Sequence, residues 1–283
     1  MKLIRYGNPG SEKPAVQEGD TRIDASEFVA DYDEAFFANN GLAELARWLG
    51  SNRRSAKQVP AQLRLGSPIA RPSKIVCVGL NFHDHAAESE MPSPAEPVLF
   101  MKSTTSLVGP NDNLVFPRNA SKVDWEVELA VVIGKKASYV RKENALQYVA
   151  GFALHNDYSE RSFQLERGGQ WVKGKSADTF APLGPFLATK DEIPNYNDLR
   201  MWLTVNGQFR QNGSTAQMIF DVATLVSYIS EFMTLLPCDV ISTGTSAGVG
   251  LGMTPPQFLK VGDIVELGID GLGISRQHVV ACP

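Results

Sequence analysis

The chain has 283 residues and a net charge of −4, because its 31 acidic residues exceed its 27 basic residues. Hydrophobic residues make up 43% and charged residues 20%, values typical of a globular protein that argue against wholesale disorder. The sequence has no basic run, no signal-peptide core and no apolar run of the roughly 20 residues that a membrane helix needs. We therefore expect a cytoplasmic protein that binds neither nucleic acid nor a membrane. Three scattered cysteines are too few for a disulfide framework or a zinc site.

Residues 1–72 are predicted to form a small N-terminal accessory domain. Residues 1–6 fit a strand, and a stretch rich in glycine and proline follows it. A short helix that ends at Gly50 is indicated by a single apolar face, formed by Leu42, Leu45, Ala46 and Leu49. Residues 51–71 are polar and interrupted by proline, which is typical of a linker. This part of the chain contains no evident catalytic cluster.

Residues 73–283 are predicted to form the main domain, in which strands outnumber helices. The dipeptide Asn206-Gly207 between two apolar runs is a strong hairpin signal. The other predicted strands are residues 74–78, 125–133, 239–242 and 264–267, and the predicted helices are 144–148 and 222–232. This pattern favours a β-rich α+β fold over a doubly wound parallel sheet.

Residues 169–176 match the phosphate-loop pattern G-x-x-x-x-G-K-S letter for letter. That pattern binds phosphate only between a buried strand and the start of a helix. The charged residues before it are not strand-like, and Pro182 and Pro185 after it prevent a sustained helix. We therefore do not expect nucleotide binding by this loop.

The segment around Glu126 and Glu128 carries the clearest chemical signal. In a strand these two side chains share one face, about 6.6 Å apart, beside the apolar residues of the same strand. Buried carboxylates repel each other and resist desolvation, and a hard cation such as Mg²⁺ or Mn²⁺, with Ca²⁺ as an alternative, would relieve both problems. Asp157, which follows an apolar run, is the candidate third ligand. The alternatives are a solvated edge strand for the two glutamates and a turn or helix N-cap for Asp157.

Motifs in consistent order from about residue 74 to the C-terminus resemble the fumarylacetoacetate hydrolase family, in its acylpyruvase-like branch. The first half of the resemblance rests on residues 78–88 (VGLNFHDHAAE), 97–102 (PVLFMK) and 124–134 (DWEVELAVVIG). The second half rests on residues 156–164 (NDYSERSFQ), 174–185 (GKSADTFAPLGP), 205–207 (VNG) and 239–245 (DVISTGT). Chain length and the N-terminal residues MKLIRYG also resemble the bacterial 2,4-diketo-3-deoxy-rhamnonate and -fuconate hydrolases of this family.

The resemblance implies a mixed β-roll catalytic domain over residues 73–283, the accessory domain over 1–72, and a homodimer. It implies one Mg²⁺ or Mn²⁺ per subunit, with the metal ligands falling on Glu126, Glu128 and Asp157. A catalytic His–Glu dyad in a lid would fall on His85 and Glu88, one helical turn apart. The same resemblance implies that Lys175 is catalytic, that Arg161 braces Asp157, and that Arg161, Gln164 and Thr245 contact the substrate.

The implied reaction is hydrolysis of the C3–C4 bond of a 2,4-dioxo acid, an acylpyruvate or a diketo sugar acid, to pyruvate and a second acid. The same site chemistry leaves several alternatives open. These are fumarylpyruvate hydrolysis, oxaloacetate decarboxylation, 2-oxo-4-enoate hydration, a ureidoglycolate lyase-like activity, and a metal-stabilised scaffold without activity.

Overall fold

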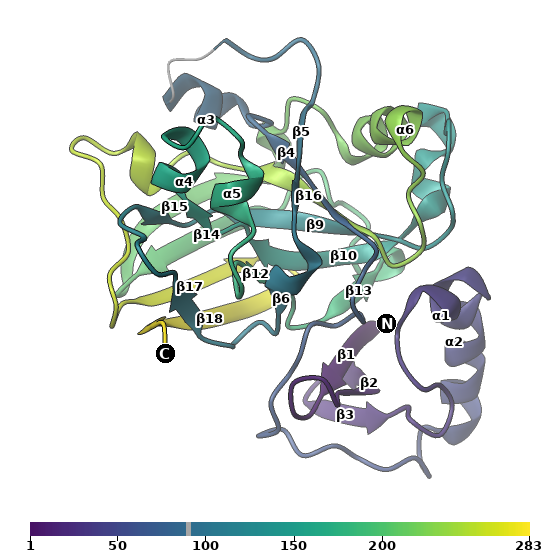
Figure 1. The fold of residues 1–283 in the computed structure, drawn as a ribbon. Coiled ribbons are helices and arrows are strands. Elements are labelled where there is room, and N and C mark those ends of the chain that lie inside the picture. The colour runs from purple at the N-terminus through teal and green to yellow at the C-terminus, as the bar shows by residue number, and fades with distance from the viewer. Residues whose placement is uncertain (89–91) are drawn as a thin grey trace.

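A computed structural model describes residues 1–88 and 92–283 of the chain, and it is strand-rich (Figure 1). Its main sheet has nine strands in the order β3-β2-β1-β13-β10-β9-β16-β4-β5. In chain order these are β1 (Lys2–Tyr6), β2 (Lys13–Glu18), β3 (Thr21–Asp24), β4 (Ile75–Gly79), β5 (Val98–Lys102), β9 (Val127–Ile133), β10 (Val149–Asn156), β13 (Leu187–Thr189) and β16 (Val240–Thr245). The predicted α+β, β-rich fold class is confirmed.

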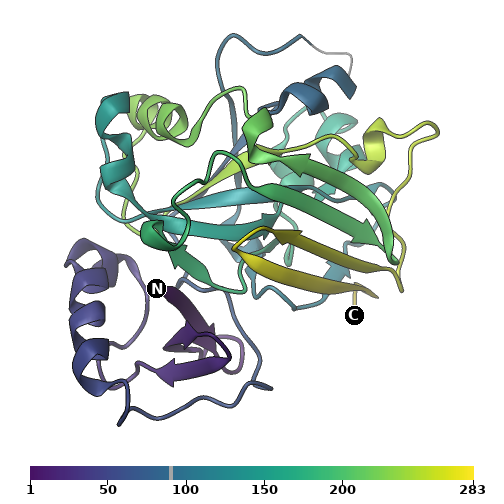
Figure 2. The same cartoon turned by 180° about the vertical axis from the view of Figure 1, so that it is seen from behind.

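A second sheet has five strands in the order β15-β14-β17-β18-β7, and Figure 2 shows it facing the viewer from behind. It comprises β7 (Leu114–Phe116), β14 (Arg200–Val205), β15 (Gln208–Ser214), β17 (Ile264–Ile269) and β18 (Gly273–Ala281). Two small pairs complete the β-structure, β6 (Leu107–Val108) with β12 (Ala181–Pro182) and β8 (Val123–Asp124) with β11 (Ser159–Glu160). A continuous apolar core joins the two large sheets.

The helices fall into groups with different places in the fold. The short helices α3 (His83–Glu88), α4 (Arg161–Leu165) and α5 (Val172–Lys175) gather at one end of the main sheet (Figure 1). The other α-helices are α1 (Glu34–Ala38), α2 (Gly41–Asn52) and α6 (Val222–Phe232), and the 3-10 helices are η1 (Thr104–Ser106), η2 (Lys142–Tyr148), η3 (Lys190–Glu192), η4 (Thr215–Gln217) and η5 (Gly250–Gly252). None of the helices described for residues 1–88 and 92–283 is long and apolar enough to cross a membrane.

Several predicted elements are confirmed and others shift at their ends. The strand β1, the helix α6 and the Asn206-Gly207 hairpin lie where they were expected. The predicted helix 144–148 is instead the 3-10 helix η2, and α2 continues two residues past Gly50. The phosphate-loop lookalike has α4 before it rather than a strand, as its context predicted.

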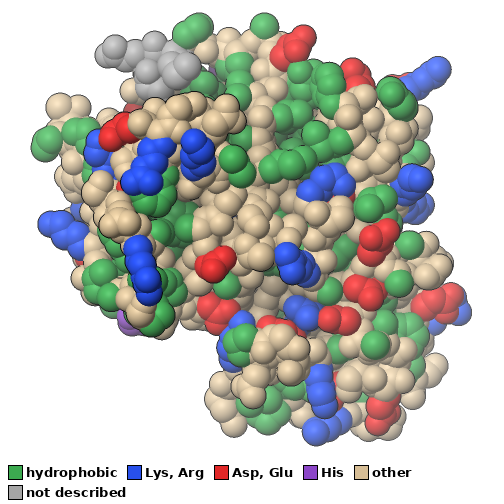
Figure 3. Space-filling model, in the orientation of Figure 1, with side chains coloured by type: hydrophobic (Ala, Val, Ile, Leu, Met, Phe, Trp, Pro, Cys, Tyr) green, Lys and Arg blue, Asp and Glu red, His purple; other side chains and the backbone are tan. Residues whose placement is uncertain are grey.

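The N-terminal strands are hydrogen-bonded into the main sheet, because β1 pairs with β13. Helices α1 and α2 pack on this N-terminal part, away from α3, α4 and α5 (Figure 1). On the face shown in Figure 3, acidic and basic side chains are interspersed. The division of the chain after residue 72 remains a prediction.

The central strand β9 explains how charged side chains come to lie deep in the protein. All of its residues are buried, because it lies between β10 and β16 and both of its faces are covered. Val127, Leu129 and Val131 point into one apolar cluster, whereas Ala130 and Val132 point into another. The predicted alternation is therefore confirmed, and the alternative of a solvated edge strand is wrong.

Candidate metal and active site

Three carboxylates meet where β9 begins and β10 ends. These strands are antiparallel, and Glu128 lies opposite His155 in the register. Glu126 just precedes β9 and Asp157 just follows β10, where the Asp157 N–H donates to the Glu126 carbonyl at 2.9 Å. One oxygen from each of Glu126, Glu128 and Asp157 lies within 4.8 Å of the others. The sequence-predicted trio is thus brought together, and each member is buried.

Buried cationic side chains neutralise two of these three carboxylates. The Lys175 ammonium donates to Glu126 at 2.6 Å and to Asp157 at 3.0 Å. The Lys102 ammonium donates to the other oxygen of Asp157 at 2.5 Å. Burial alone would raise the pKa of Asp157, but Lys102 and Lys175 outweigh it and hold that pKa well below its ordinary range. Asp157 is therefore ionised at neutral pH. Its alternative role as a helix N-cap is wrong, because Glu160 is the N-cap of α4.

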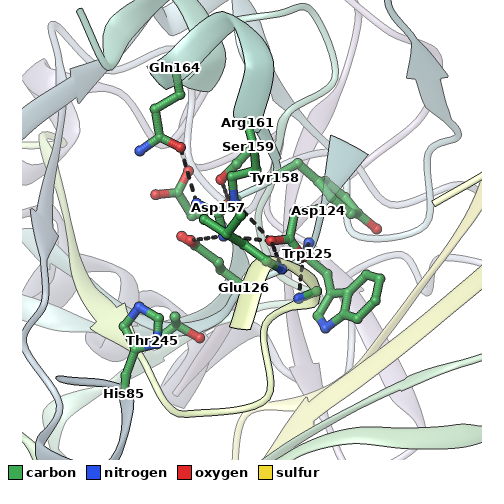
Figure 4. Close-up of polar contacts among 12 residues, drawn as sticks. His85, Asp124, Trp125, Glu126, Asp157, Tyr158, Ser159, Arg161, Gln164 and Thr245 are labelled. Carbon is green, nitrogen blue, oxygen red and sulfur yellow. Dashed lines mark hydrogen bonds and ion pairs between the residues drawn. The ribbon is translucent and has the colours of Figure 1, made fainter. Parts of the chain in front are cut away.

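Arg161 contacts different partners from those expected. Its guanidinium donates to Asp124 at 2.8 Å and to Glu126 at 2.7 Å, as Figure 4 shows. The expectation that Arg161 braces Asp157 is therefore wrong, and Lys102 and Lys175 take that place. Burial would raise the pKa of Glu126, but Lys175 and Arg161 hold it below its ordinary value. Glu126 consequently keeps its negative charge.

Glu128 is the carboxylate that lacks a cationic partner among the described residues. One of its oxygens accepts hydrogen bonds from the Ser242 hydroxyl at 2.5 Å and the Gly244 N–H at 2.9 Å. Burial, followed by repulsion from Asp157 and Glu126, raises the pKa of Glu128 well above its ordinary value. Glu128 therefore either carries a proton or needs a cation nearby to hold its negative charge.

These observations test whether a divalent cation fits the trio. Two metal–oxygen bonds of about 2.0–2.4 Å together span about 4–4.8 Å, which matches the spread of the three oxygens. The donors are all carboxylate oxygens, which hard cations such as Mg²⁺ and Mn²⁺ prefer. Glu126, Glu128 and Asp157 therefore fit such an ion.

Replacing Lys102 with methionine is expected to destabilise the protein by about 3–5 kcal/mol, because a buried carboxylate loses one of its two cations. Lys102 is completely buried, and its ammonium also donates to the Tyr158 carbonyl at 3.0 Å. Chemical denaturation would measure the loss. The control is Lys136→Met, since Lys136 is exposed and a surface substitution changes stability by within about 0.5 kcal/mol. Equal stability of the two variants would contradict the assigned role.

The His85–Glu88 pair lies on α3 at the mouth of the site. The His85 Nδ1 is 3.2 Å from one oxygen of Glu88, so the contact expected from one helical turn is present. The other oxygen of Glu88 accepts from the Gly248 N–H at 2.9 Å, which fixes the carboxylate. A Cβ at Gly252 would lie 2.5 Å from the Glu88 carboxyl carbon, so a side chain there would displace the Glu88 carboxylate.

These groups meet at two adjoining cavities. An inner cavity of about 60 Å³ is lined by His85, Glu126, Glu128 and Lys175 among others. An outer cavity of about 570 Å³ is lined by the His85–Glu88 pair and by several apolar side chains. The two cavities share the lining residues Leu80, His85, Arg161, Gln164 and Trp171. In Figure 4, His85 lies beside Thr245, across Glu126 from Gln164.

The residues expected to contact the substrate, Arg161, Gln164 and Thr245, line the inner cavity. Some of their polar atoms already form hydrogen bonds within the protein. The Gln164 oxygen accepts from Arg161 at 3.1 Å. The Thr245 hydroxyl donates to the Val127 carbonyl and accepts from Gln211, each at 2.8 Å. Thr245 is therefore held firmly in place, whereas a substrate role for it remains a prediction.

Sequence reasoning missed some supporting residues. The Asp124 carboxylate accepts hydrogen bonds from the Arg161 guanidinium and from the N–H groups of Gly250 at 2.7 Å and Leu251 at 3.0 Å. Asp124 thereby ties Arg161 to the loop that walls the outer cavity. Lys102 was also missed, although it ends one of the quoted motifs. A charged residue at the end of an apolar strand was the signal that pointed to it.

Comparisons with known proteins show the family of the chain. The sequence profile described as "Fumarylacetoacetate (FAA) hydrolase C-terminal" matches residues 74–280. A Burkholderia multivorans relative, named only as a candidate hydrolase, is 50% identical over 279 residues, which are 98% of each chain.

Two solved structures each match over 100% of both chains. The fumarylacetoacetate hydrolase of Exiguobacterium antarcticum has a TM-score of 0.87 and 34% identity. The maleylpyruvate hydrolase of Sphingobium sp. SYK-6, solved with manganese(II) and pyruvate, has a TM-score of 0.84 and 27% identity. The chain belongs to the fumarylacetoacetate hydrolase family.

Proposed function

We propose that the protein is a metal-dependent hydrolase that cleaves the C3–C4 bond of a 2,4-dioxo acid to pyruvate and a second acid. The observation that carries this proposal is that Glu126, Glu128, Lys175 and His85 line one small cavity, while an oxygen of Asp157 lies within 4.8 Å of an oxygen of each glutamate. The maleylpyruvate hydrolase relative, solved with manganese(II) and pyruvate, supports the same choice of ligands. The homodimer remains a prediction from the family resemblance.

Each group has a distinct task in this proposal. Glu126, Glu128 and Asp157 would hold a bound Mg²⁺ or Mn²⁺. The ion would supply Lewis acidity toward the oxygens of a 2-oxo acid. Glu88 orients the His85 ring, and His85 takes a proton from a water molecule. The resulting hydroxide attacks C4, and the electrons of the C3–C4 bond pass to C3 as the pyruvate enolate.

Lys175 contributes where negative charge develops. Burial would lower the pKa of Lys175, but Asp157 and Glu126 raise it above its ordinary value, so the ammonium stays charged. A fixed positive charge in a buried site stabilises the enolate oxygen more than it would in water. Protonation of C3 then yields pyruvate, and the acyl group leaves as a carboxylic acid.

An assay of pyruvate release tests this function. The purified protein with Mg²⁺ or Mn²⁺ is expected to release pyruvate and the matching acid from acylpyruvates in equal amounts. Oxaloacetate and a 2-oxo-4-enoate are the comparison substrates. Carbon dioxide release from oxaloacetate, with no turnover of any 2,4-dioxo acid, would favour a decarboxylase and contradict the proposal.

Metal binding is expected to release a proton at pH values below the raised pKa of Glu128, because its carboxyl then carries a proton without a cation. The metal needs the deprotonated form, so affinity should fall about tenfold for each pH unit below that pKa. Titration calorimetry with Mn²⁺ in buffers of different ionisation enthalpy would count the protons. The Glu128→Gln variant should release none, and affinity that is independent of pH would contradict the prediction.

A further inference from the structure

The inner cavity is too small to hold an entire 2,4-dioxo acid. Its volume of about 60 Å³ holds only a few water molecules, because about 10–15 Å³ of such space accommodates one. Since the two cavities adjoin at His85 and Arg161, the rest of the substrate must extend into the outer cavity. The outer volume of about 570 Å³ lies within the range usual for small-molecule sites, about 300–1,000 Å³. Its lining therefore decides which group beyond C4 is accepted.

The outer cavity is lined mostly by apolar side chains that come from separate segments. Six of these uncharged side chains are those of Leu80, Leu165, Trp171, Val249, Leu251 and Met253. Leu165 and Leu251 are about half-exposed, at 47% and 39%. An apolar ligand group that covered them would remove their surface from water, which is favourable in proportion to the area covered.

No cationic side chain that lines the outer cavity among the described residues is left free to bind a second carboxylate. Arg161 is the one lysine or arginine that lines the outer cavity among the described residues. Its guanidinium already donates to Asp124, Glu126 and Gln164 at 2.8, 2.7 and 3.1 Å. The remaining residues, 89–91, have the sequence Ser-Glu-Met and contain neither lysine nor arginine.

The outer cavity also carries a negative charge, that of Glu88. Glu88 lines the outer cavity, with its oxygens bonded to His85 and to the Gly248 N–H. A substrate carboxylate placed in this cavity would lose its hydration without gaining an ion pair, and Glu88 would repel it. Hydroxyl groups on the substrate would lose water against a mostly apolar lining, where Gln164 and Thr254 are the only amide or hydroxyl side chains among the described residues.

We infer that the outer cavity is a subsite for an uncharged, apolar acyl group, so that the substrate is a 2,4-dioxo acid with an alkyl or aryl group on C4. This inference rests on the proposed function for the reacting head group. It differs from the diketo sugar acid expected from the resemblance and from a tail that carries a second carboxylate.

Arg210 offers the competing interpretation. Its guanidinium lies 3.9 Å from the Met253 sulfur, behind the cavity wall, and has no carboxylate partner among the described residues. Movement of Met253 would bring that charge into the outer cavity. A preference for a charged tail that disappears in the Arg210→Met variant would establish this interpretation and overturn ours.

A substrate series measures the preference. We expect kcat/KM for pyruvate release to rise about fourfold for each methylene group added to acetylpyruvate, so that butanoylpyruvate exceeds it about 15-fold. Benzoylpyruvate should also exceed acetylpyruvate, whereas fumarylpyruvate and a hydroxylated 2,4-dioxo acid should fall below it. A higher value for either polar substrate than for butanoylpyruvate would overturn the inference.

A substitution at Leu251 tests the same subsite from the protein side. The Leu251→Arg variant places a cation at a half-exposed position of the cavity wall, where the fold should tolerate it. We expect it to lower kcat/KM for butanoylpyruvate about tenfold and to raise that for fumarylpyruvate. The matched control is Leu63→Arg, because Leu63 is similarly exposed, at 40%, but remote from the cavity. An unchanged preference in Leu251→Arg would count against the inference.

A binding measurement separates this inference from the proposed function. Saturated 2-oxo acids of increasing length, from 2-oxobutanoate to 2-oxooctanoate, are tested for the rise in melting temperature that they cause with Mn²⁺ present. A rise that grows with chain length supports the apolar subsite even if no 2,4-dioxo acid is cleaved, a result that would overturn the hydrolase alone. A rise that does not depend on chain length would overturn the subsite.

Discussion

The Glu126→Gln variant is expected to lose turnover by on the order of 10³-fold or more and to lose Mn²⁺ binding with it. Glu126 is the shared partner of Lys175 at 2.6 Å and Arg161 at 2.7 Å, and it is also a proposed metal ligand. Glutamine keeps the shape of the side chain but removes the negative charge that Lys175, Arg161 and the proposed metal ion all need. Pyruvate release and the Mn²⁺-dependent rise in melting temperature would measure the two losses.

The matched control for this substitution is Glu143→Gln, since Glu143 is exposed at the start of η2 and far from the trio in the fold. It should keep both turnover and the response to Mn²⁺. Circular dichroism would establish that both variants are folded. A Glu126→Gln protein that still responded to Mn²⁺ like the unaltered protein would contradict the ligand assignment.

The sequence predicted the carboxylate trio because two local rules meet at this point. Alternation along a strand put Glu126 and Glu128 on one face, and the apolar run before Asp157 placed that residue at a strand end. That β9 and β10 pair in the register that joins these positions comes from long-range packing. The family motifs supplied this pairing, since no local pattern contains it.

Other features could not be derived from local patterns. Residues 51–71 read as a polar linker, yet Ile69 within them is completely buried against the main sheet. Lys102 and Asp157 are 55 positions apart, and their contact depends on how β5 lies at the edge of the sheet. The wall of the outer cavity combines loops and short helices, which have no periodicity to detect.

The His85→Ala variant is expected to lose about 10²–10⁴-fold in turnover while it still binds Mn²⁺. The His85 ring lines both cavities and is oriented by Glu88, but its side chain is not one of the three proposed metal ligands. Removing it should therefore remove the general base without disturbing the cation. Turnover of acetylpyruvate and the Mn²⁺-dependent melting shift would separate these two effects.

His83 provides the matched control, because it lies on the same helix α3 but its side chain is exposed. The His83→Ala variant should keep turnover within about twofold, since it alters α3 by a similar change of side chain without touching the cavity. Equal losses in both variants would mean that the integrity of α3 matters rather than the His85 imidazole. Full activity of His85→Ala would contradict its role as the base and would favour a different proton acceptor.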